Sequence, residues 1–202
     1  SVANQTKLIM KLFILIYRFF LSLRYKVTVK GTEILDPKKA KLFLPNHQAH
    51  VDPQIVFSHM YKHDKVSPVV AERFYNTPVL RSLFKFFKAV PVSELDRGSR
   101  DTNVLENIFK NVNIHLQSGR SAILYPAGQI QGQGYEKIFN KQAAHQIVQH
   151  LPENTQVIGV RINGLWGSMW SKAWTGKSPF FFKTLLRGVW FTFANLLFLT
   201  PK

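Results

Sequence analysis

Residues 42–57, LFLPNHQAHVDPQIVF, hold two histidines and an aspartate between two apolar runs. The first run predicts a strand that ends at Leu44, because Pro45 has no backbone N–H to donate to a sheet. Asp52 and Pro53 predict a helix over 53–63, with Asp52 as its N-cap and Pro53 in its first turn. The stretch therefore predicts a strand, a polar loop and a helix in succession, the unit from which α/β folds are built.

The same alternation continues along the chain. Short runs rich in β-forming residues lie at 27–29, 42–44, 66–70, 90–92, 122–125 and 157–162. Helical patterns begin at Pro53, at Thr77-Pro78, at Ser99 and near residue 140, and the one from Ser99 ends at Ser118-Gly119. We therefore expect an α/β fold with a mostly parallel central sheet flanked by helices.

The N-terminal segment, residues 7–27, is apolar almost all round. Lys7, Lys11, Arg18 and Ser22 fall on one narrow stripe of a helix. Arg18 interrupts the roughly 18–20 apolar residues that a membrane-spanning helix needs, and no small-residue cleavage site of a signal peptide follows. We expect an amphipathic helix that lies in the membrane interface, with a helix packed in the core as the alternative.

The C-terminal segment, residues 179–199, is also mostly apolar, with Lys183 and Arg187 among aromatic and aliphatic residues. Tryptophan, phenylalanine and basic residues together are typical of the membrane interface. The expected organisation has three parts: an interface helix at 1–26, an α/β domain at 27–178 and a membrane-associating segment at 179–202. The chain does not begin with Met and stops after an apolar run, so we expect it to belong to a longer protein.

The composition restricts the chemistry. The 202 residues include no cysteine, which excludes disulfides and thiolate nucleophiles. A net charge of +16 indicates an anionic partner, such as an acidic carrier, a polyanionic substrate or a membrane surface, unless the charges only solubilise an apolar chain. Nucleic acid is not expected, because the basic residues form no dense run and no aromatic RNA-binding motif is present.

His47 and Asp52 are the candidate chemical pair. An aspartate that accepts the Nδ1 proton of a histidine leaves Nε2 free to take a proton from a substrate hydroxyl. A metal site would need His47, His50 and Asp52 together, with His59 or His63, but no known metal-ligand spacing supports it. A serine hydrolase is not indicated either, because no GxSxG sequence is present.

Residues 122–139, AILYPAGQIQGQGYEKIF, form a second candidate region. A strand ends at the turn Tyr125-Pro126, and Gly128, Gly132 and Gly134 follow. Such a loop can present N–H groups to an anion or to a developing oxyanion, although a flexible connection would look the same. It is not a nucleotide-binding loop, since it has neither GxxxxGK nor GxGxxG.

These regions together resemble the glycerolipid acyltransferases. NHQAHVD (46–52) resembles their H-x4-D motif, and LYPAGQI (124–130) resembles their F-P-E-G-x-R block. KAVPVSELDR (88–97) is similar to the block between them, and VIGVRI (157–162) to a later apolar block. The resemblance covers roughly residues 25–165, and the layout is most like the acyltransferase part of 2-acylglycerophosphoethanolamine acyltransferases.

The resemblance implies an enzyme of phospholipid synthesis that moves a fatty acyl group from a thioester to the free hydroxyl of a lysophospholipid. His47 would be the general base and Asp52 its orienting partner, without a covalent acyl-enzyme and without a cofactor. The donor would be acyl-CoA or acyl carrier protein. The protein would lie on a membrane, at the cytoplasmic face of the inner or plasma membrane.

Two positions depart from the family pattern, because Ala127 stands where the family has Glu and Gln129 where it has Arg. These changes argue against lysophosphatidate, whose phosphomonoester dianion needs strong cationic recognition. A silent lipid-binding or membrane-tethering domain and an acyl-thioester hydrolase are the alternatives. The residues expected to bind substrate are Asn46, Arg97, Arg100, Tyr125, Pro126, Gly128, Gln129 and Lys137.

Overall fold

The computed structural model describes residues 2–92, 102–132, 135–137 and 143–198. Its strands are β1 (Ala40–Pro45), β2 (Val66–Ala71), β3 (Val90–Val92), β4 (Ser121–Ile123) and β5 (Thr155–Val160). Its helices are α1 (Val2–Ser22), α2 (Asp52–Met60), α3 (Glu72–Tyr75), α4 (Pro78–Phe86), α5 (Thr102–Gln117), α6 (Ala143–Gln149), α7 (Phe181–Phe198) and the 3₁₀ turn η1 (Thr32–Ile34).

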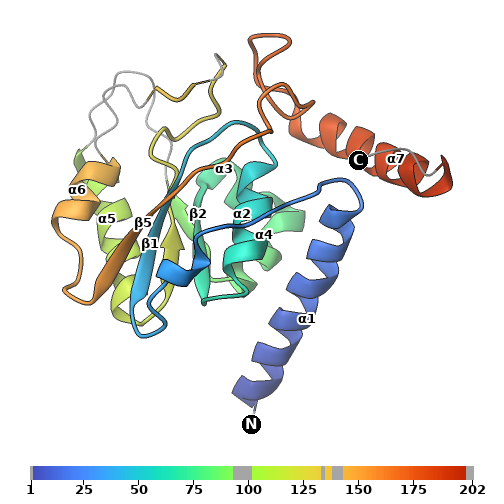
Figure 1. Cartoon of the computed structure of the whole chain (residues 1–202). Helices are drawn as coiled ribbons and strands as arrows, with labels where there is room; N and C mark the ends of the chain where they lie inside the picture. The colour runs from blue at the N-terminus through green and yellow to red at the C-terminus, as the bar shows by residue number, and fades with distance from the viewer. Residues whose placement is uncertain (1, 93–101, 133–134, 138–142, 199–202) are drawn as a thin grey trace.

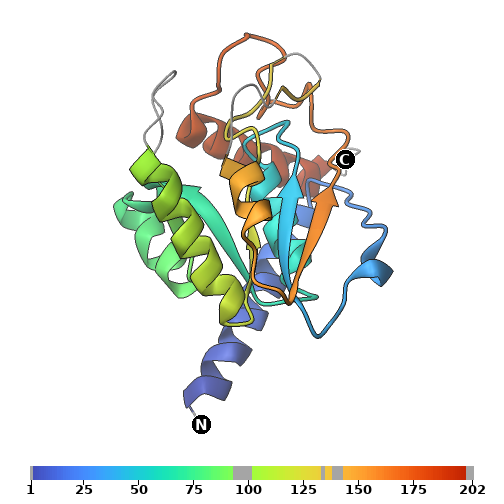
Figure 2. The ribbon, with the colours of Figure 1, turned by 90° about the vertical axis from the view of Figure 1, so that its left-hand side faces the viewer.

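The five strands form one parallel sheet in the order β3-β2-β4-β1-β5. Strand β1 therefore lies between β4 and β5, which follow it by some 80 and 115 residues in the chain. Leu42 is paired with both Ala122 and Val157. The expected α/β fold with a parallel sheet flanked by helices is confirmed (Figures 1 and 2).

Alternate residues of β1 enter two different apolar cores. Leu42 packs with Val112 of α5 and Ile147 of α6 on one face of the sheet. Phe43 packs with Val56 of α2 on the other face. Both β1 residues are fully buried, as the period of two along a strand requires for a strand covered on both faces.

The prediction of a strand at residues 27–29 is wrong. These residues have no strand partner, and the side chains of Val27 and Val29 are 37% and 41% exposed. Three β-forming residues make a strand only when another strand supplies hydrogen-bond partners, and β5 instead pairs with β1. The expected helix start at Ser99 lies outside the described residues, and α5 is described from Thr102.

The terminal helices α1 and α7 lie on the same side of the sheet domain (Figure 1). Helix α1 contacts the domain through Ile14, which is 5% exposed, and through Phe13, whose ring lies 5.5 Å from that of Phe87. Of the expected basic stripe of α1, Arg18 is half-buried with its Nε shielded from solvent, and Lys11 is exposed. No helix in the described part of the chain is long and apolar enough to span a bilayer.

Candidate active site

His47 and Asp52 lie at the carboxyl end of β1, where ligands of parallel α/β sheets commonly bind. His47 Nδ1 is 3.0 Å from Asp52 Oδ2. The aspartate side chain is fully buried and the histidine side chain is 12% exposed. The structure thus joins the two residues that the sequence analysis paired, with Nδ1 as the ring nitrogen that faces the aspartate.

Asp52 holds the loop that carries the histidine. Its Oδ2 also accepts hydrogen bonds from the backbone N–H groups of Gln48, at 2.5 Å, and Ala49, at 2.8 Å. The expected N-cap role of Asp52 is therefore wrong: Val51 is the N-cap of α2, and no side chain caps this helix. The carboxylate is turned back toward the preceding loop because that loop holds three donors for one oxygen.

The His47 ring rests on a partly buried tyrosine whose hydroxyl is shielded from solvent. The ring centroids of His47 and Tyr125 are 4.5 Å apart, with the planes tilted by 40°. Burial raises the pKa of Tyr125 well above its usual value, and the negative charge of Asp52 raises it further. Tyr125 therefore remains a neutral, apolar support for the imidazole rather than an acid at physiological pH.

Long-range hydrogen bonds fix the same loop to the segment after β5. The Asn46 side chain accepts from the backbone N–H of Ile162 at 2.6 Å and donates to the Ile162 carbonyl at 3.1 Å. Gln48 Oε1 accepts from the N–H groups of Leu165 and Trp166 at 3.1 and 3.2 Å. These bonds position His47 from outside its own loop, which reduces its freedom to leave the site.

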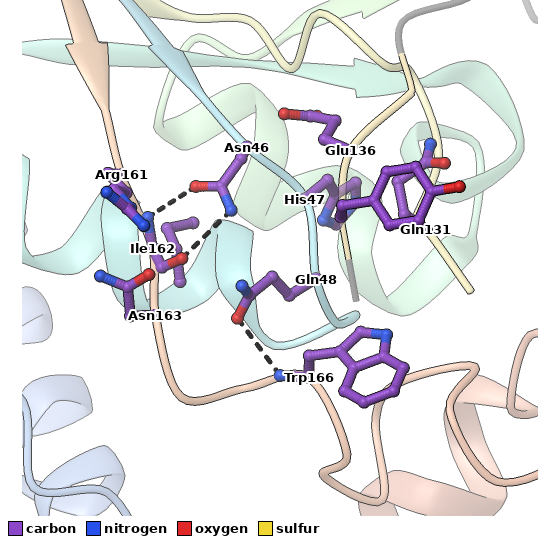
Figure 3. A pocket seen from close by; sticks show the side chains of 10 residues that line it. Asn46, His47, Gln48, Gln131, Glu136, Arg161, Ile162, Asn163 and Trp166 are labelled. Atoms are coloured by element: carbon purple, nitrogen blue, oxygen red, sulfur yellow. Dashed lines mark hydrogen bonds between the residues drawn. The ribbon is translucent and has the colours of Figure 1, made fainter. Parts of the chain in front are cut away.

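A pocket of about 230 Å³ opens beside His47 (Figure 3). It lies where the residues following β1, β4 and β5 meet. Its lining is mostly polar and is formed by Asn46, His47, Gln48, Gln131, Tyr135, Glu136, Arg161, Ile162, Asn163 and Trp166.

Of the expected substrate-binding residues that the structure describes, only Asn46 lines this pocket. Tyr125 lies beneath the histidine. The turn 125–128 is closed by a hydrogen bond from the Gly128 N–H to the Tyr125 carbonyl at 3.0 Å, so this N–H has a partner within the turn. Gln129 is exposed, and Lys137 places its ammonium 5.2 Å from the Tyr135 ring. Arg97 and Arg100 lie outside the described residues.

The pocket also contains residues that the sequence analysis missed. Arg161 and Asn163 directly follow β5, at the same sheet edge as His47, so the strand-end rule applied to 157–162 would have found them. Gln131 donates its backbone N–H to the His47 carbonyl at 3.2 Å. Glu136 carries no comparable signal in the sequence, because its place depends on the path of the loop after β4.

Glu136 is a half-buried carboxyl group beside the general-base candidate. Burial raises its pKa, and this effect outweighs the opposing influence of a hydrogen bond from the His47 backbone and of the His47 charge. Its Oε1 is buried and has no hydrogen-bond partner among the described residues. In the described ranges, at this site or elsewhere, no three His, Cys, Asp or Glu side chains gather as metal ligands would.

His50 does not line the pocket and has a different environment. Its ring lies 6.5 Å from that of Phe181, and its backbone N–H donates to the Trp170 carbonyl at 3.1 Å. Burial, together with the nearby positive charges of His47, Arg73 and Lys172, lowers the pKa of His50 to about 4. The folded protein therefore keeps His50 neutral at pH values where a free histidine is charged.

We expect the protein to lose stability as the pH falls from about 6.5 to about 4. In that range an unfolded His50 binds a proton and the folded one does not, so protonation favours the unfolded state. Burial also lowers the pKa of His59 and of His115, which adds to the loss, while the raised pKa of Glu136 opposes it. Urea unfolding at a series of pH values measures the effect. His50→Gln should flatten the dependence, and an unchanged slope in that variant contradicts the assignment.

Comparison with known proteins identifies a matching family and a similar solved structure. The sequence model of the Acyltransferase family matches residues 26–163. The crystal structure of PlsC, a 1-acyl-sn-glycerophosphate (LPA) acyltransferase from Thermotoga maritima, is similar with a TM-score of 0.62 and 18% sequence identity. That match covers 86% of this chain and 66% of PlsC, so the chain spans just under two thirds of its length. No curated protein sequence matches the chain.

The family match extends over more than half of the residues and includes His47, Asp52 and the strands that position them. The chain belongs to the Acyltransferase family.

Proposed function

We propose that the protein transfers a fatty acyl group from an acyl thioester to the free hydroxyl of a lysophospholipid. His47 serves as general base and Asp52 orients it. The observation that carries this proposal is the 3.0 Å bond between His47 Nδ1 and Asp52 Oδ2 at the edge of a polar pocket. The bond keeps a proton on Nδ1 and directs the basic lone pair of Nε2 away from the aspartate.

The reaction needs no covalent intermediate. The acceptor oxygen attacks the thioester carbonyl while Nε2 of His47 removes the hydroxyl proton. The tetrahedral intermediate then breaks its carbon–sulfur bond, and the imidazolium returns the proton to the leaving thiolate. The products are an ester and a free thiol. The chain has no cysteine, and no described residue takes the role of an acylated nucleophile in this scheme.

We infer the classes of acyl donor and acyl acceptor from the charges of the chain and of the substrates. Coenzyme A is polyanionic and acyl carrier protein is acidic, so either thioester suits a chain of net charge +16. PlsC acts on 1-acyl-sn-glycerophosphate, a phosphomonoester, as its description states. For this chain we favour a lysophospholipid with a phosphodiester, such as 2-acylglycerophosphoethanolamine, because Ala127 and Gln129 replace the charged pair of the family pattern.

The test is an assay of the purified protein with a labelled acyl thioester and a panel of lysophospholipids. Formation of diacyl phospholipid is the expected result. Consumption of the thioester without diacyl product contradicts acyl transfer and indicates a hydrolase. Binding of lysophospholipid vesicles without turnover of any thioester indicates a silent lipid-binding domain.

We also propose that α1 and α7 hold the protein on a membrane surface, at the cytoplasmic face of the inner or plasma membrane. Most large apolar side chains of α7 are exposed, and Thr184 is its one buried residue. An apolar helix with basic residues is stable in the bilayer interface, where its side chains leave water and its charges meet anionic lipids. The exposed apolar residues of the two helices are Leu8, Ile9, Leu12, Phe13, Leu15, Ile16, Phe19, Phe20, Phe182, Leu185, Leu186, Val189, Trp190, Phe193, Leu196, Leu197 and Phe198.

Replacing Leu186 and Trp190 by aspartate should release the protein from anionic vesicles. The two side chains are 73% and 70% exposed and lie four residues apart on one face of α7. Full burial of such a side chain contributes roughly 1.5–3 kcal/mol, so we expect at least a tenfold fall in partitioning. Co-sedimentation with vesicles of phosphatidylethanolamine and phosphatidylglycerol measures it. Ile34→Asp, at a 58% exposed site on η1, is the matched control. Equal binding of all variants contradicts the role of α7.

A further inference from the structure

The pocket beside His47 contains one guanidinium and one carboxylate outside the His47–Asp52 pair. Arg161 is the first residue after β5 and is exposed to solvent. Glu136 lies on the segment that follows β4 and is half-buried. Figure 3 shows the two side chains at separate places around the pocket, with Asn46 between Arg161 and His47. The other lining residues are amides, two aromatic residues and an isoleucine.

These two charges do not neutralise each other. Neither Arg161 nor Glu136 takes part in an ion pair within the described part of the chain. Glu136 Oε1 is shielded from solvent without a hydrogen-bond partner among the described residues. A buried acceptor without a donor is unfavourable, so a ligand that brings an N–H group to this oxygen gains free energy on binding.

We propose that this pocket binds the headgroup of the acceptor lipid, with Arg161 on the phosphodiester and Glu136 Oε1 on a primary ammonium group. This assignment rests on the acyl transfer proposed above and adds the two residues that would recognise a zwitterionic headgroup, Arg161 and Glu136. The planar guanidinium presents two parallel N–H groups that match two phosphate oxygens. The primary ammonium group supplies a donor to Glu136 Oε1, the carboxylate oxygen that has no hydrogen-bond partner among the described residues.

The size of the pocket agrees with a headgroup. Sites that enclose a whole drug-sized molecule have volumes of roughly 300–1,000 Å³. At about 230 Å³ this pocket accommodates a headgroup and part of the glycerol, and the acyl chain stays outside. A headgroup held here places the glycerol hydroxyl close to Nε2 of His47, because the same histidine lines the pocket.

The two charges also predict which headgroups are rejected. A phosphomonoester carries nearly two negative charges, which a single guanidinium balances incompletely and the Glu136 carboxylate repels. A glycerol headgroup brings no positive charge to Glu136. A choline headgroup brings a charge but no N–H group, so it cannot donate to Oε1. Among these acceptors, lysophosphatidylethanolamine is therefore expected to be preferred.

The test measures acyl transfer to the lysophospholipids of ethanolamine, choline, glycerol and the free phosphomonoester. Arg161→Gln should raise the acceptor KM roughly tenfold or more for the phosphodiester acceptors, with little change in kcat, since charge-assisted hydrogen bonds are stronger than neutral ones. The KM of the acyl thioester should stay unchanged. Glu136→Gln should reduce the preference for ethanolamine over glycerol roughly tenfold, because a neutral amide attracts ammonium weakly. Lys62→Gln, which removes an exposed charge between α2 and β2, should change none of these values.

A binding measurement tests the headgroup site independently of the acyl-transfer reaction. Binding of soluble glycerophosphoethanolamine, followed by saturation-transfer NMR, should be seen with the unaltered protein and lost in Arg161→Gln. Acyl transfer with the same headgroup preference in all variants overturns the headgroup site and leaves the reaction intact. Binding that depends on Arg161 without acyl transfer to any acceptor overturns the reaction and leaves the headgroup site. A rise only in the thioester KM assigns Arg161 to the phosphates of the donor and contradicts the proposal.

Discussion

Replacing His47 with alanine should reduce acyl transfer by roughly 100-fold or more, the usual scale for loss of a general base. The acceptor hydroxyl has a pKa far above neutrality, so attack on the thioester requires a group that takes its proton in the same step. His47 is the lining residue whose second ring nitrogen is held by a buried carboxylate. The loss should appear in kcat, with the thioester KM little changed, because the imidazole acts on the reacting proton.

The matched control is a second histidine of the same loop. His50 lies three residues away but outside the pocket, so His50→Gln should keep most of the activity at pH 7.5. Both variants are assayed with a labelled acyl thioester and lysophosphatidylethanolamine, after their melting temperatures have been compared. Wild-type activity in a folded His47→Ala protein would falsify the mechanism. Equal losses in both variants would indicate a disturbed loop instead of a missing base.

The two simplest replacements of Asp52 should separate its chemical role from its structural one. Asp52→Asn keeps the shape and an acceptor oxygen for the loop, but it removes the charge. Its amide can also donate to Nδ1 and so favour the tautomer in which Nε2 carries the proton and cannot act as a base. We expect activity to fall roughly 10- to 100-fold, less than at His47, with stability nearly unchanged.

Asp52→Ala removes the carboxylate that accepts from three buried or partly buried donors: the N–H groups of Gln48 and Ala49 and Nδ1 of His47. Unpaired buried donors cost about 1–3 kcal/mol each, partly relieved by water, so we expect the free energy of unfolding to fall by about 2–4 kcal/mol. Urea unfolding and the transfer assay, run on both variants, check this. A stability loss in Asp52→Asn as large as in Asp52→Ala would show that its lower activity reflects unfolding.

Much of the fold could be predicted from local patterns. The runs at 42–44, 66–70, 90–92 and 157–162 each correspond to a strand, since a buried parallel strand is recognisable from a few apolar, β-forming residues. The run at 27–29 has the same residue types and forms no strand. It forms no strand because no neighbouring strand pairs with it, and a local sequence pattern does not show which segments become neighbours.

The His47–Asp52 pair was predictable because both residues belong to one short loop. The two residues are five positions apart, between the end of a strand and the start of a helix, and this brings them together whatever the rest of the chain does. The direction of the carboxylate was not predictable, since capping the helix and holding the loop use the same oxygens. The folded loop presents three donors on one side of Asp52, and this decided the choice.

The sequence by itself determined the parallel α/β fold, the candidate base with its partner, and the family. Only the tertiary structure decided what surrounds them. Glu136 and Arg161 reach the His47 pocket from loops about 90 and 115 residues along the chain, because β4 and β5 flank β1 in the sheet. The order of strands in a sheet arises from packing between distant segments, and local periodicity does not encode it. The reacting pair is therefore a property of one loop, and the pocket around it is a property of the whole fold.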